Sequence, residues 1–123
     1  LRVADLMHVG KELPLIGEDA GMQDAILTIT AKTYGCVGVV NPAGDLVGII
    51  TDGDLRRHMG DDLLHRRVAE VMTAKPRTIR ANALAAEALH VMNEKSITSL
   101  FVIEDRKPVG IVRLHDCLKV GVA

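Results

Sequence analysis

The sequence predicts an α/β fold of the α+β kind, in which two pseudo-symmetric β-α-β-β-α repeats pack sheet to sheet as one module. The first observation is an internal repeat, because Val-Ala-Asp-Leu-Met at residues 3–7 returns as Val-Ala-Glu-Val-Met at residues 68–72. The second is that apolar residues recur at helical spacing at corresponding places in both halves. The third is a pair of apolar runs, joined by a turn, that follows each helical pattern. An internal repeat indicates the architecture more firmly than any single motif.

The boundaries of the repeats follow from this comparison. We expect the first repeat at residues 1–60, a linker at residues 61–67 and the second repeat at residues 68–123. The linker is polar and charged, and it is too short to let the two halves move independently. Neither half holds many large side chains, so each is expected to bury its sheet face against the other.

Each element of the first repeat has its own signal. A short extended piece is predicted at Leu15 and Ile16. Next comes a helix whose apolar residues lie at positions i, i+3, i+4 and i+7, namely Met22, Ala25, Ile26 and Ile29. The continuous apolar run at residues 36–40 predicts a buried strand, and residues 46–50 predict a second strand after a turn rich in Pro, Gly and Asp. A final helix is expected to start near Asp52.

The second repeat gives the same succession. An extended piece is predicted at Thr78 and Ile79, and two strands are predicted at residues 100–103 and 109–112. The final helix is expected to start near Leu114, and the turn between the strands is one residue shorter than in the first repeat. The helix between the extended piece and the strands repeats the earlier apolar spacing, with Ala85, Ala88, Leu89 and Met92.

Composition excludes several classes of function. The 123 residues are 48% hydrophobic and 25% charged, which suits one compact domain with a substantial core. No apolar run approaches the roughly 18 residues that a membrane helix needs, so no membrane partner is expected. The net charge is −1, and one Tyr, one Phe and no Trp leave no platforms on which bases could stack, so no nucleic-acid partner is expected.

The two cysteines and the first residue bear on the origin of the chain. Cys36 and Cys117 lie in apolar surroundings without metal-ligand spacing, so we expect reduced core residues and a cytoplasmic location. The sequence shows no secretory signal. The chain begins with Leu1 rather than Met, which indicates a piece of a longer protein.

Thr51 and Asp54 lie where a predicted strand passes into a helix, and two interpretations compete for them. As N-cap and third helical residue, they form an arrangement like a capping box. Alternatively, the helix N-terminus and the Thr51 hydroxyl bind a phosphate, Asp54 binds the two hydroxyls of a ribose, and Arg57 with its neighbour Arg56 adds guanidinium donors. This copy taken alone favours the cap.

The corresponding position in the second repeat shifts the balance toward a ligand. Arg113 replaces the threonine, whereas Asp116 keeps the carboxylate without a capping hydroxyl beside it. The two copies together therefore favour a ligand role. Arg113 either clamps a phosphate or fills the site and closes it, so the two sites are not expected to be equivalent.

We expect no catalytic residue and no metal site in this chain. The five histidines form no zinc-binding motif. The Asp-x-Asp pair at residues 52–54 begins like a calcium loop, but Arg56 stands where the third oxygen ligand belongs. Cys36 lies in a predicted buried strand, and Ser96 and Ser99 have no partner pattern around them.

The two β-α-β-β-α units, each with a Gly-hydrophobic-hydrophobic-x-x-x-Asp stretch near its end, resemble over the whole chain a pair of CBS domains, named after cystathionine β-synthase. More specific stretches resemble the C-terminal half of bacterial arabinose-5-phosphate isomerases. They are Gly-Ile-Ile-Thr-Asp-Gly-Asp-Leu-Arg-Arg at residues 48–57, Asp-Leu-Met-His at residues 5–8, and the ending from Leu114 through Gly121. Those enzymes join an N-terminal sugar-isomerase domain to a CBS pair and convert ribulose 5-phosphate to arabinose 5-phosphate for the Kdo sugar of lipopolysaccharide.

The resemblance implies a disc-like module with two clefts that bind adenosine nucleotides, the threonine contacting phosphate and the aspartate the ribose. No cofactor is required, and in the second cleft only Asp116 matches this pattern. The residues carried over to the first cleft are Leu15, Ile16, Val37, Ile50, Thr51, Asp54 and Arg57. Those carried over to the second cleft are Thr78, Ser99, Arg113 and Asp116.

The functional hypothesis that follows is a regulatory pair that senses a nucleotide or nucleotide-sugar, such as AMP, ATP or CMP-Kdo. CMP-Kdo, the activated end product of the pathway, offers a ribose to Asp54 and a negative charge to Arg57 or Arg113. The resemblance implies an isomerase domain in cis, a CBS dimer, and a tetramer of the full-length enzyme, with no isomerase activity in this fragment. The alternative is a structural dimerisation module with a vestigial ligand cleft.

Overall fold

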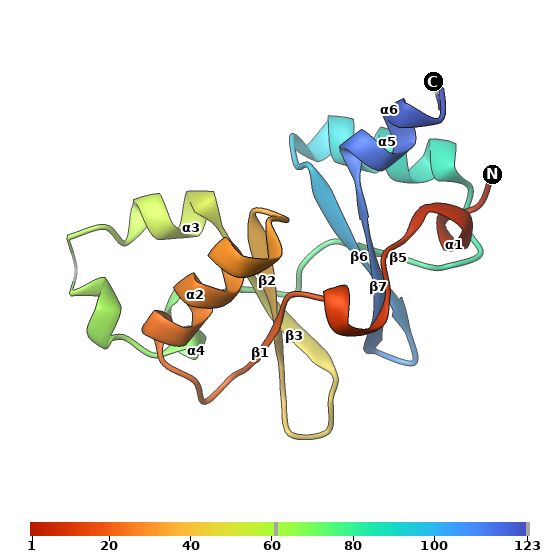
Figure 1. The fold of residues 1–123 in the computed structure, drawn as a ribbon. Helices are drawn as coiled ribbons and strands as arrows, with labels where there is room; N and C mark the ends of the chain where they lie inside the picture. Colours follow the sequence, from red (N-terminus) through yellow and green to blue (C-terminus); the bar gives the residue numbers. More distant parts are fainter. Residues whose placement is uncertain (61, 123) are drawn as a thin grey trace. The chain divides into compact units, whose positions relative to one another are not determined.

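The computed structural model describes residues 1–60 and 62–122. They form two compact units, which we call unit I (Pro14–Pro76) and unit II (Leu1–Leu13 together with Arg77–Ala123). Each unit contains its own small sheet and its own hydrophobic core (Figure 1).

Unit I is a four-stranded sheet with helices packed against it. Its strands are β1 (Leu15–Gly17), β2 (Cys36–Val40), β3 (Leu46–Thr51) and β4 (Thr73–Ala74), in the spatial order β1-β2-β3-β4. β1 pairs with β2 in parallel, and the other pairings are antiparallel. Its helices are α2 (Met22–Lys32), α3 (Asp52–Arg57), the 3₁₀ turn η2 (Leu63–His65) and α4 (Val68–Val71).

Unit II repeats this plan with three strands. The strands β5 (Thr78–Ile79), β6 (Ser99–Glu104) and β7 (Lys107–Arg113) lie in that order, with β5 parallel to β6 and β6 antiparallel to β7. Its helices are α1 (Val3–Leu6), the 3₁₀ turn η1 (Gly10–Glu12), α5 (Ala85–Lys95) and α6 (Leu114–Lys119).

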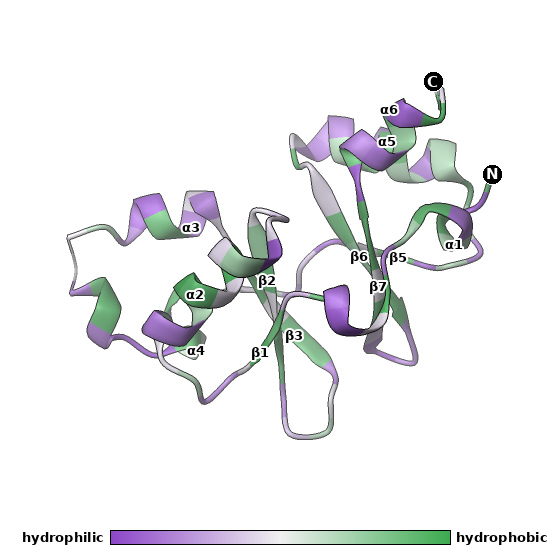
Figure 2. Cartoon of the chain, in the orientation of Figure 1, coloured by the Kyte–Doolittle hydropathy of each residue, from purple (hydrophilic) through white to green (hydrophobic). Residues whose placement is uncertain are grey.

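The apolar patterns explain why each core lies where it does. The residues expected on the inner faces of the long helices, such as Met22 on α2 and Met92 on α5, are almost entirely buried. Figure 2 shows hydrophilic and hydrophobic residues alternating along α5 beside largely hydrophobic strands. The predicted strands and helices are therefore confirmed, with differences of one or two residues at some strand ends.

The two hairpins confirm the expected difference in turn length. Between β2 and β3, Asn41 N–H donates to the carbonyl of Asp45, and Gly44 in the loop has a φ of 89°. Between β6 and β7, Glu104 pairs with Lys107, so only two residues form the loop. Both of them have positive φ, 50° at Asp105 and 68° at Arg106, as a type I′ turn requires.

The leading segment of each repeat crosses to the sheet of the other repeat, which the sequence patterns do not predict. The segment at residues 1–13, from the first repeat, belongs to unit II, and the segment at residues 68–76, from the second repeat, belongs to unit I. The four-residue helices α1 and α4 in these segments are too short to show a period. The compact units therefore do not coincide with the sequence repeats.

Two matched close approaches hold these leading segments. A Cβ added to Gly48 would lie 2.4 Å from Met72 Sδ, and one added to Gly110 would lie 2.6 Å from Met7 Sδ. The absence of a side chain at each glycine lets the methionine of a leading segment lie directly on the strand. The repeated methionine and the repeated glycine are thus complementary parts of one packing contact.

In the described part of the chain, no helix has the length and apolar character that crossing a bilayer requires.

Candidate functional site

The first candidate site is a buried carboxylate at the start of α3. Asp54 is only 2% exposed, and each of its oxygens accepts two hydrogen bonds. Oδ2 accepts from the backbone N–H of Thr51 at 2.9 Å and from its hydroxyl at 3.1 Å. Oδ1 accepts from the hydroxyl of Thr73 at 2.8 Å and from Nη2 of Arg57. We call these four residues the Asp54 cluster.

The strand-to-helix transition explains the first half of this cluster. Thr51 ends β3 and is the N-cap of α3, and its hydroxyl accepts from the backbone N–H of Asp54 at 3.4 Å. The capping interpretation of this motif is therefore confirmed. The Asp54 carboxylate accepts all four of these hydrogen bonds from the protein itself. The ligand role of Asp54 stays a prediction. Arg57 is the exposed partner, since 64% of its side chain is accessible to solvent.

The second candidate site surrounds Asp116 at the start of α6. Arg113 donates to its carboxylate from the backbone N–H at 2.9 Å, from Nε at 3.2 Å and from Nη2 at 3.0 Å. His8 Nε2 lies 3.1 Å from each of the two carboxylate oxygens. Glu12 lies on the other side of the imidazole, with 3.7 Å between its Oε2 and His8 Nδ1. We call His8, Arg113 and Asp116 the Asp116 cluster.

These contacts decide the charge of Asp116. Burial raises its pKa, but the hydrogen bonds from Arg113 and from His8, together with the positive charge available on His8, outweigh burial and hold the pKa below its ordinary value of 3.8. Asp116 is therefore a carboxylate at neutral pH. The Arg113 guanidinium contacts this carboxylate directly, and its expected role, to clamp a phosphate or to close the site, stays a prediction.

Thr73 and His8 are the residues that sequence reasoning missed. Each directly follows the methionine of a leading segment, so they occupy corresponding positions in the two repeats. Thr73 pairs with Ile49 across the sheet of unit I, and His8 pairs with Ile111 in unit II. The available signal was the position after the repeated Val-Ala-acid-x-Met stretch, but only the crossing of the segments reveals which aspartate each residue meets.

The other predicted ligand residues are divided between surface and core. Leu15 and Ile16 are half-buried on β1, and Thr78 and Ser99 are half-buried on β5 and β6. Ser99 pairs with Arg113 across the sheet, close to the Asp116 cluster. Val37 and Ile50 are opposite each other on β2 and β3, and both are fully buried in the core of unit I. Their side chains offer no surface to a ligand in this structure.

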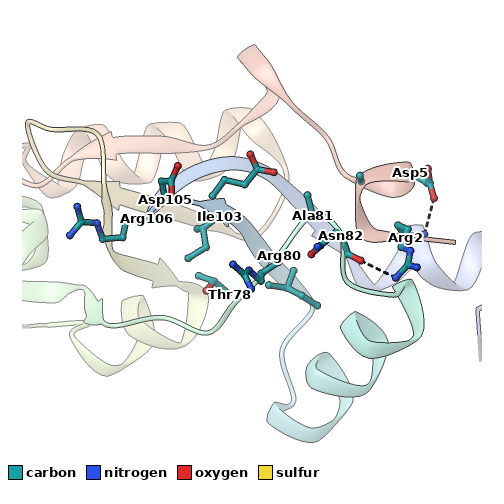
Figure 3. Close-up of a pocket in the computed structure, with 12 residues that line it drawn as sticks. Arg2, Asp5, Thr78, Arg80, Ala81, Asn82, Ile103, Asp105 and Arg106 are labelled. Atoms are coloured by element: carbon teal, nitrogen blue, oxygen red, sulfur yellow. Dashed lines mark hydrogen bonds between the residues drawn. The ribbon is translucent and has the colours of Figure 1, made fainter.

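Unit II also contains a pocket of about 930 Å³ that lies apart from both clusters (Figure 3). Three segments line it: α1 and the residue before it, β5 with the connection to α5, and the β6–β7 hairpin. Of the residues predicted to bind ligand, only Thr78 lines this pocket. Its lining side chains include Arg2, Arg80 and Arg106 as well as Asp5, Glu104 and Asp105.

Two buried cysteine thiols are further reactive groups of this chain. Burial, with a smaller contribution from the negative charge of Asp52, raises the pKa of the Cys36 thiol to about 12. Burial and the charge of Asp116 likewise raise the pKa of Cys117. Both thiols therefore stay protonated at neutral pH and make poor nucleophiles. Among residues 1–60 and 62–122, no three His, Cys, Asp or Glu side chains are grouped so as to hold a metal ion.

Comparison with known proteins gives a consistent result. The family described as "CBS domain" matches residues 3–61 and again residues 68–123. The chain is 41% identical over 124 residues to arabinose 5-phosphate isomerase KdsD of Yersinia pestis and 42% identical over 125 residues to KdsD of Pseudomonas aeruginosa. Each alignment covers 99% of this chain but only 38% of the relative, so the chain spans less than half the length of these curated relatives.

Solved structures support the fold. CBSX2, solved in complex with AMP, superposes with a TM-score of 0.83 over 97% of this chain and 94% of that chain, at 21% identity. An uncharacterized conserved protein from Pyrococcus horikoshii superposes with a TM-score of 0.87 over 98% of this chain and 53% of that chain, at 25% identity. The two family matches account for nearly the whole chain, which leaves no room in it for a catalytic isomerase domain.

Proposed function

Because this chain belongs to the CBS domain family, we propose that it is the regulatory ligand-binding pair of an arabinose-5-phosphate isomerase. The observation that carries the proposal is the identity of about 40% to KdsD enzymes along the full length of the chain. In the whole enzyme, an N-terminal sugar-isomerase domain would convert ribulose 5-phosphate to arabinose 5-phosphate for Kdo and lipopolysaccharide synthesis in the cytoplasm. The present chain would sense a ligand and alter how the catalytic domains pack.

We place the ligand, a nucleotide or nucleotide-sugar such as AMP, ATP or CMP-Kdo, at the Asp54 cluster. The exposed Arg57 is the partner of Asp54 that a ligand can displace at the lowest cost, since its side chain is already largely in water. A ribose hydroxyl would then donate to Asp54 Oδ1, and the released guanidinium would be available to a phosphate. Thr51 and Thr73 supply further hydroxyl groups around the same carboxylate.

The Asp116 cluster is the less suitable of the two sites. Its carboxylate is held by three donors of Arg113 and by His8, and the Arg113 side chain is only 32% exposed. A ligand would have to break charge-assisted hydrogen bonds that are partly shielded from water. We therefore expect one nucleotide per chain, bound on the Asp54 side.

Isothermal titration calorimetry with AMP, ATP and CMP-Kdo tests this assignment. Asp54→Asn should weaken binding at least about tenfold, because it removes the charge that accepts the ribose hydroxyls. Asp116→Asn is the matched control and should leave the affinity unchanged. Arg57→Gln, at an exposed side chain that is not expected to affect folding, provides a second variant and should also weaken binding.

Two results would contradict the assignment. One is that none of the three compounds binds at millimolar concentration. The other is that Asp116→Asn weakens binding while Asp54→Asn and Arg57→Gln do not. If binding is confirmed, regulation is tested on the full-length enzyme, in which the ligand should change isomerase activity and Asp54→Asn should abolish that change.

A second candidate function is a structural dimerisation module. The complete hydrogen bonding of the Asp54 carboxylate within the protein favours it, because no buried side-chain polar atom of residues 1–60 and 62–122 lacks a partner that a ligand would have to supply. This alternative predicts a homodimer of the isolated chain, and a tetramer of the full-length enzyme, that assemble equally well with and without nucleotide. Sedimentation measurements in the presence and absence of AMP distinguish the two functions.

A further inference from the structure

The pocket of about 930 Å³ in unit II is separate from the proposed nucleotide site. It is lined by residues of unit II only, and no member of the Asp54 cluster or the Asp116 cluster contributes to it. In Figure 3, Thr78, Arg80 and Ile103 lie in its central part, Arg2 and Asp5 at one end, and Asp105 at the other. Polar side chains therefore lie at both ends of the pocket and in its central part.

Hydrogen bonds hold two of its walls together. The backbone N–H of Ala4 on α1 donates to the carbonyl of Ala81 at 2.9 Å, and Arg2 Nη1 donates to the carbonyl of Asn82 at 3.0 Å. The third wall is part of the same sheet, because Thr78 on β5 pairs with Phe101 on β6, and β6 continues into the hairpin. Backbone and side-chain hydrogen bonds therefore join the three walls into one framework.

Three charged side chains of this pocket, Arg80, Glu104 and Asp105, are open to a bound molecule. Within residues 1–60 and 62–122, Arg80, Glu104 and Asp105 form no ion pair or side-chain hydrogen bond, although all three line the same pocket. Arg2 uses one guanidinium nitrogen for the carbonyl of Asn82 and keeps its remaining donors. Both cationic donors and anionic acceptors are thus available to a bound molecule.

This combination selects a chemical class of ligand. Guanidinium groups bind phosphate through paired hydrogen bonds, and carboxylates accept hydrogen bonds from vicinal hydroxyls. The lining arginines and carboxylates are equal in number, which disfavours a polyanion such as a nucleic acid. A pocket of this volume is ample for one small metabolite. We infer that the pocket is a binding site for a phosphorylated, hydroxyl-rich small molecule, with Arg80 as its phosphate donor.

The experiment is a titration of the ¹⁵N-labelled 123-residue chain with ribose 5-phosphate, followed by amide chemical shifts. Shifts are expected at residues 78–82 and 103–106. Ribose alone and inorganic phosphate alone should each bind at least about tenfold more weakly. Ribose has hydroxyls for the carboxylates but no phosphate for the arginines, and phosphate has the reverse. If phosphate alone binds as well as ribose 5-phosphate, or if residues 78–82 and 103–106 do not respond, the inference is wrong.

A matched pair of variants identifies the phosphate donor. Arg80→Gln should weaken binding of ribose 5-phosphate at least about tenfold, whereas Arg77→Gln should not, since Arg77 is exposed on the same segment but does not line the pocket. Equal effects of the two substitutions would refute the role of Arg80. The test is independent of the nucleotide site, because Asp54→Asn should leave these shifts intact. Shifts confined to residues 51–57 would instead place the sugar phosphate at the Asp54 cluster and overturn the inference.

Discussion

His8 Nε2 lies 3.1 Å from each carboxylate oxygen of Asp116, although the two residues are 108 positions apart. The contact joins the leading segment of the chain to its last helix, and the same segment adds a β-bridge between His8 and Ile111. Thr73 makes the corresponding contact with Asp54 in unit I, at 2.8 Å. In both units, a residue from one repeat therefore completes the hydrogen bonding of a carboxylate from the other.

The Asp116 cluster is expected to contribute to the stability of unit II. Asp116→Asn should lower the free energy of unfolding by about 1–3 kcal/mol, because it removes the charged acceptor of Arg113 and His8 at a largely buried position. Asp24→Asn is the control, since Asp24 also lies in the first turn of a helix but is exposed, and it should cost well under about 1 kcal/mol. Urea unfolding monitored by circular dichroism measures both. Equal losses in the two variants would mean that the cluster adds nothing beyond the helix dipole.

The same carboxylate should make stability depend on pH in the acid range. The pKa of Asp116 in the folded chain lies below its ordinary value of 3.8, so in that interval the unfolded chain binds more protons and stability falls as pH falls. The contribution is fully present above the ordinary pKa and is lost as pH drops through the lowered one. The difference in unfolding free energy between the natural chain and Asp116→Asn should therefore shrink from pH 6 toward pH 3. A difference that stays constant would contradict the lowered pKa.

Thr73 should stabilise unit I through its hydroxyl. Thr73→Val keeps the shape of the side chain but removes the donor to Asp54, which should cost about 0.5–1.5 kcal/mol. Thr30→Val serves for comparison, because the Thr30 hydroxyl donates to the carbonyl of Ile26 in a bond that is exposed to water, whereas Thr73 donates to the buried carboxylate of Asp54. Thermal unfolding by calorimetry distinguishes the two. The interpretation fails if the Thr73 substitution is as mild as the Thr30 substitution.

Gly48 is expected to be intolerant even of alanine. Its added Cβ would lie 2.4 Å from Met72 Sδ and 3.1 Å from the carbonyl oxygen of Thr73, so both the side chain and the strand β4 must shift. We expect Gly48→Ala to destabilise the chain by about 1–3 kcal/mol. Gly17→Ala, on β1 of the same sheet, meets no atom within 4 Å and should be neutral or slightly stabilising. Similar unfolding midpoints for the two variants would show that Met72 and β4 can move away from residue 48 without loss of stability.

Local sequence patterns were sufficient to predict most helices and strands of the chain. The helices α2 and α5 and the strands β2, β3, β6 and β7 were predictable because burial of one helix face or of a whole strand leaves a periodic or continuous run of apolar residues. The capping pair of Thr51 and Asp54 was also predictable, because both residues lie within one helical turn and their contact depends on local sequence alone. Val37 and Ile50 show the limit of this approach, because an apolar residue beside a predicted cleft has the same sequence signature whether it faces ligand or core.

The sequence by itself thus determined the repeat, the order of its elements and the two carboxylates at the starts of α3 and α6. Only the tertiary structure decided which residues surround those carboxylates and that a charged pocket forms in unit II. The physical reason is that the leading segments cross to the opposite sheets, held by Met7 against Gly110 and by Met72 against Gly48. Such a contact depends on the shapes of two distant segments and leaves no period in either. His8 and Thr73 therefore take their roles from the crossing of the chain, not from their neighbours in sequence.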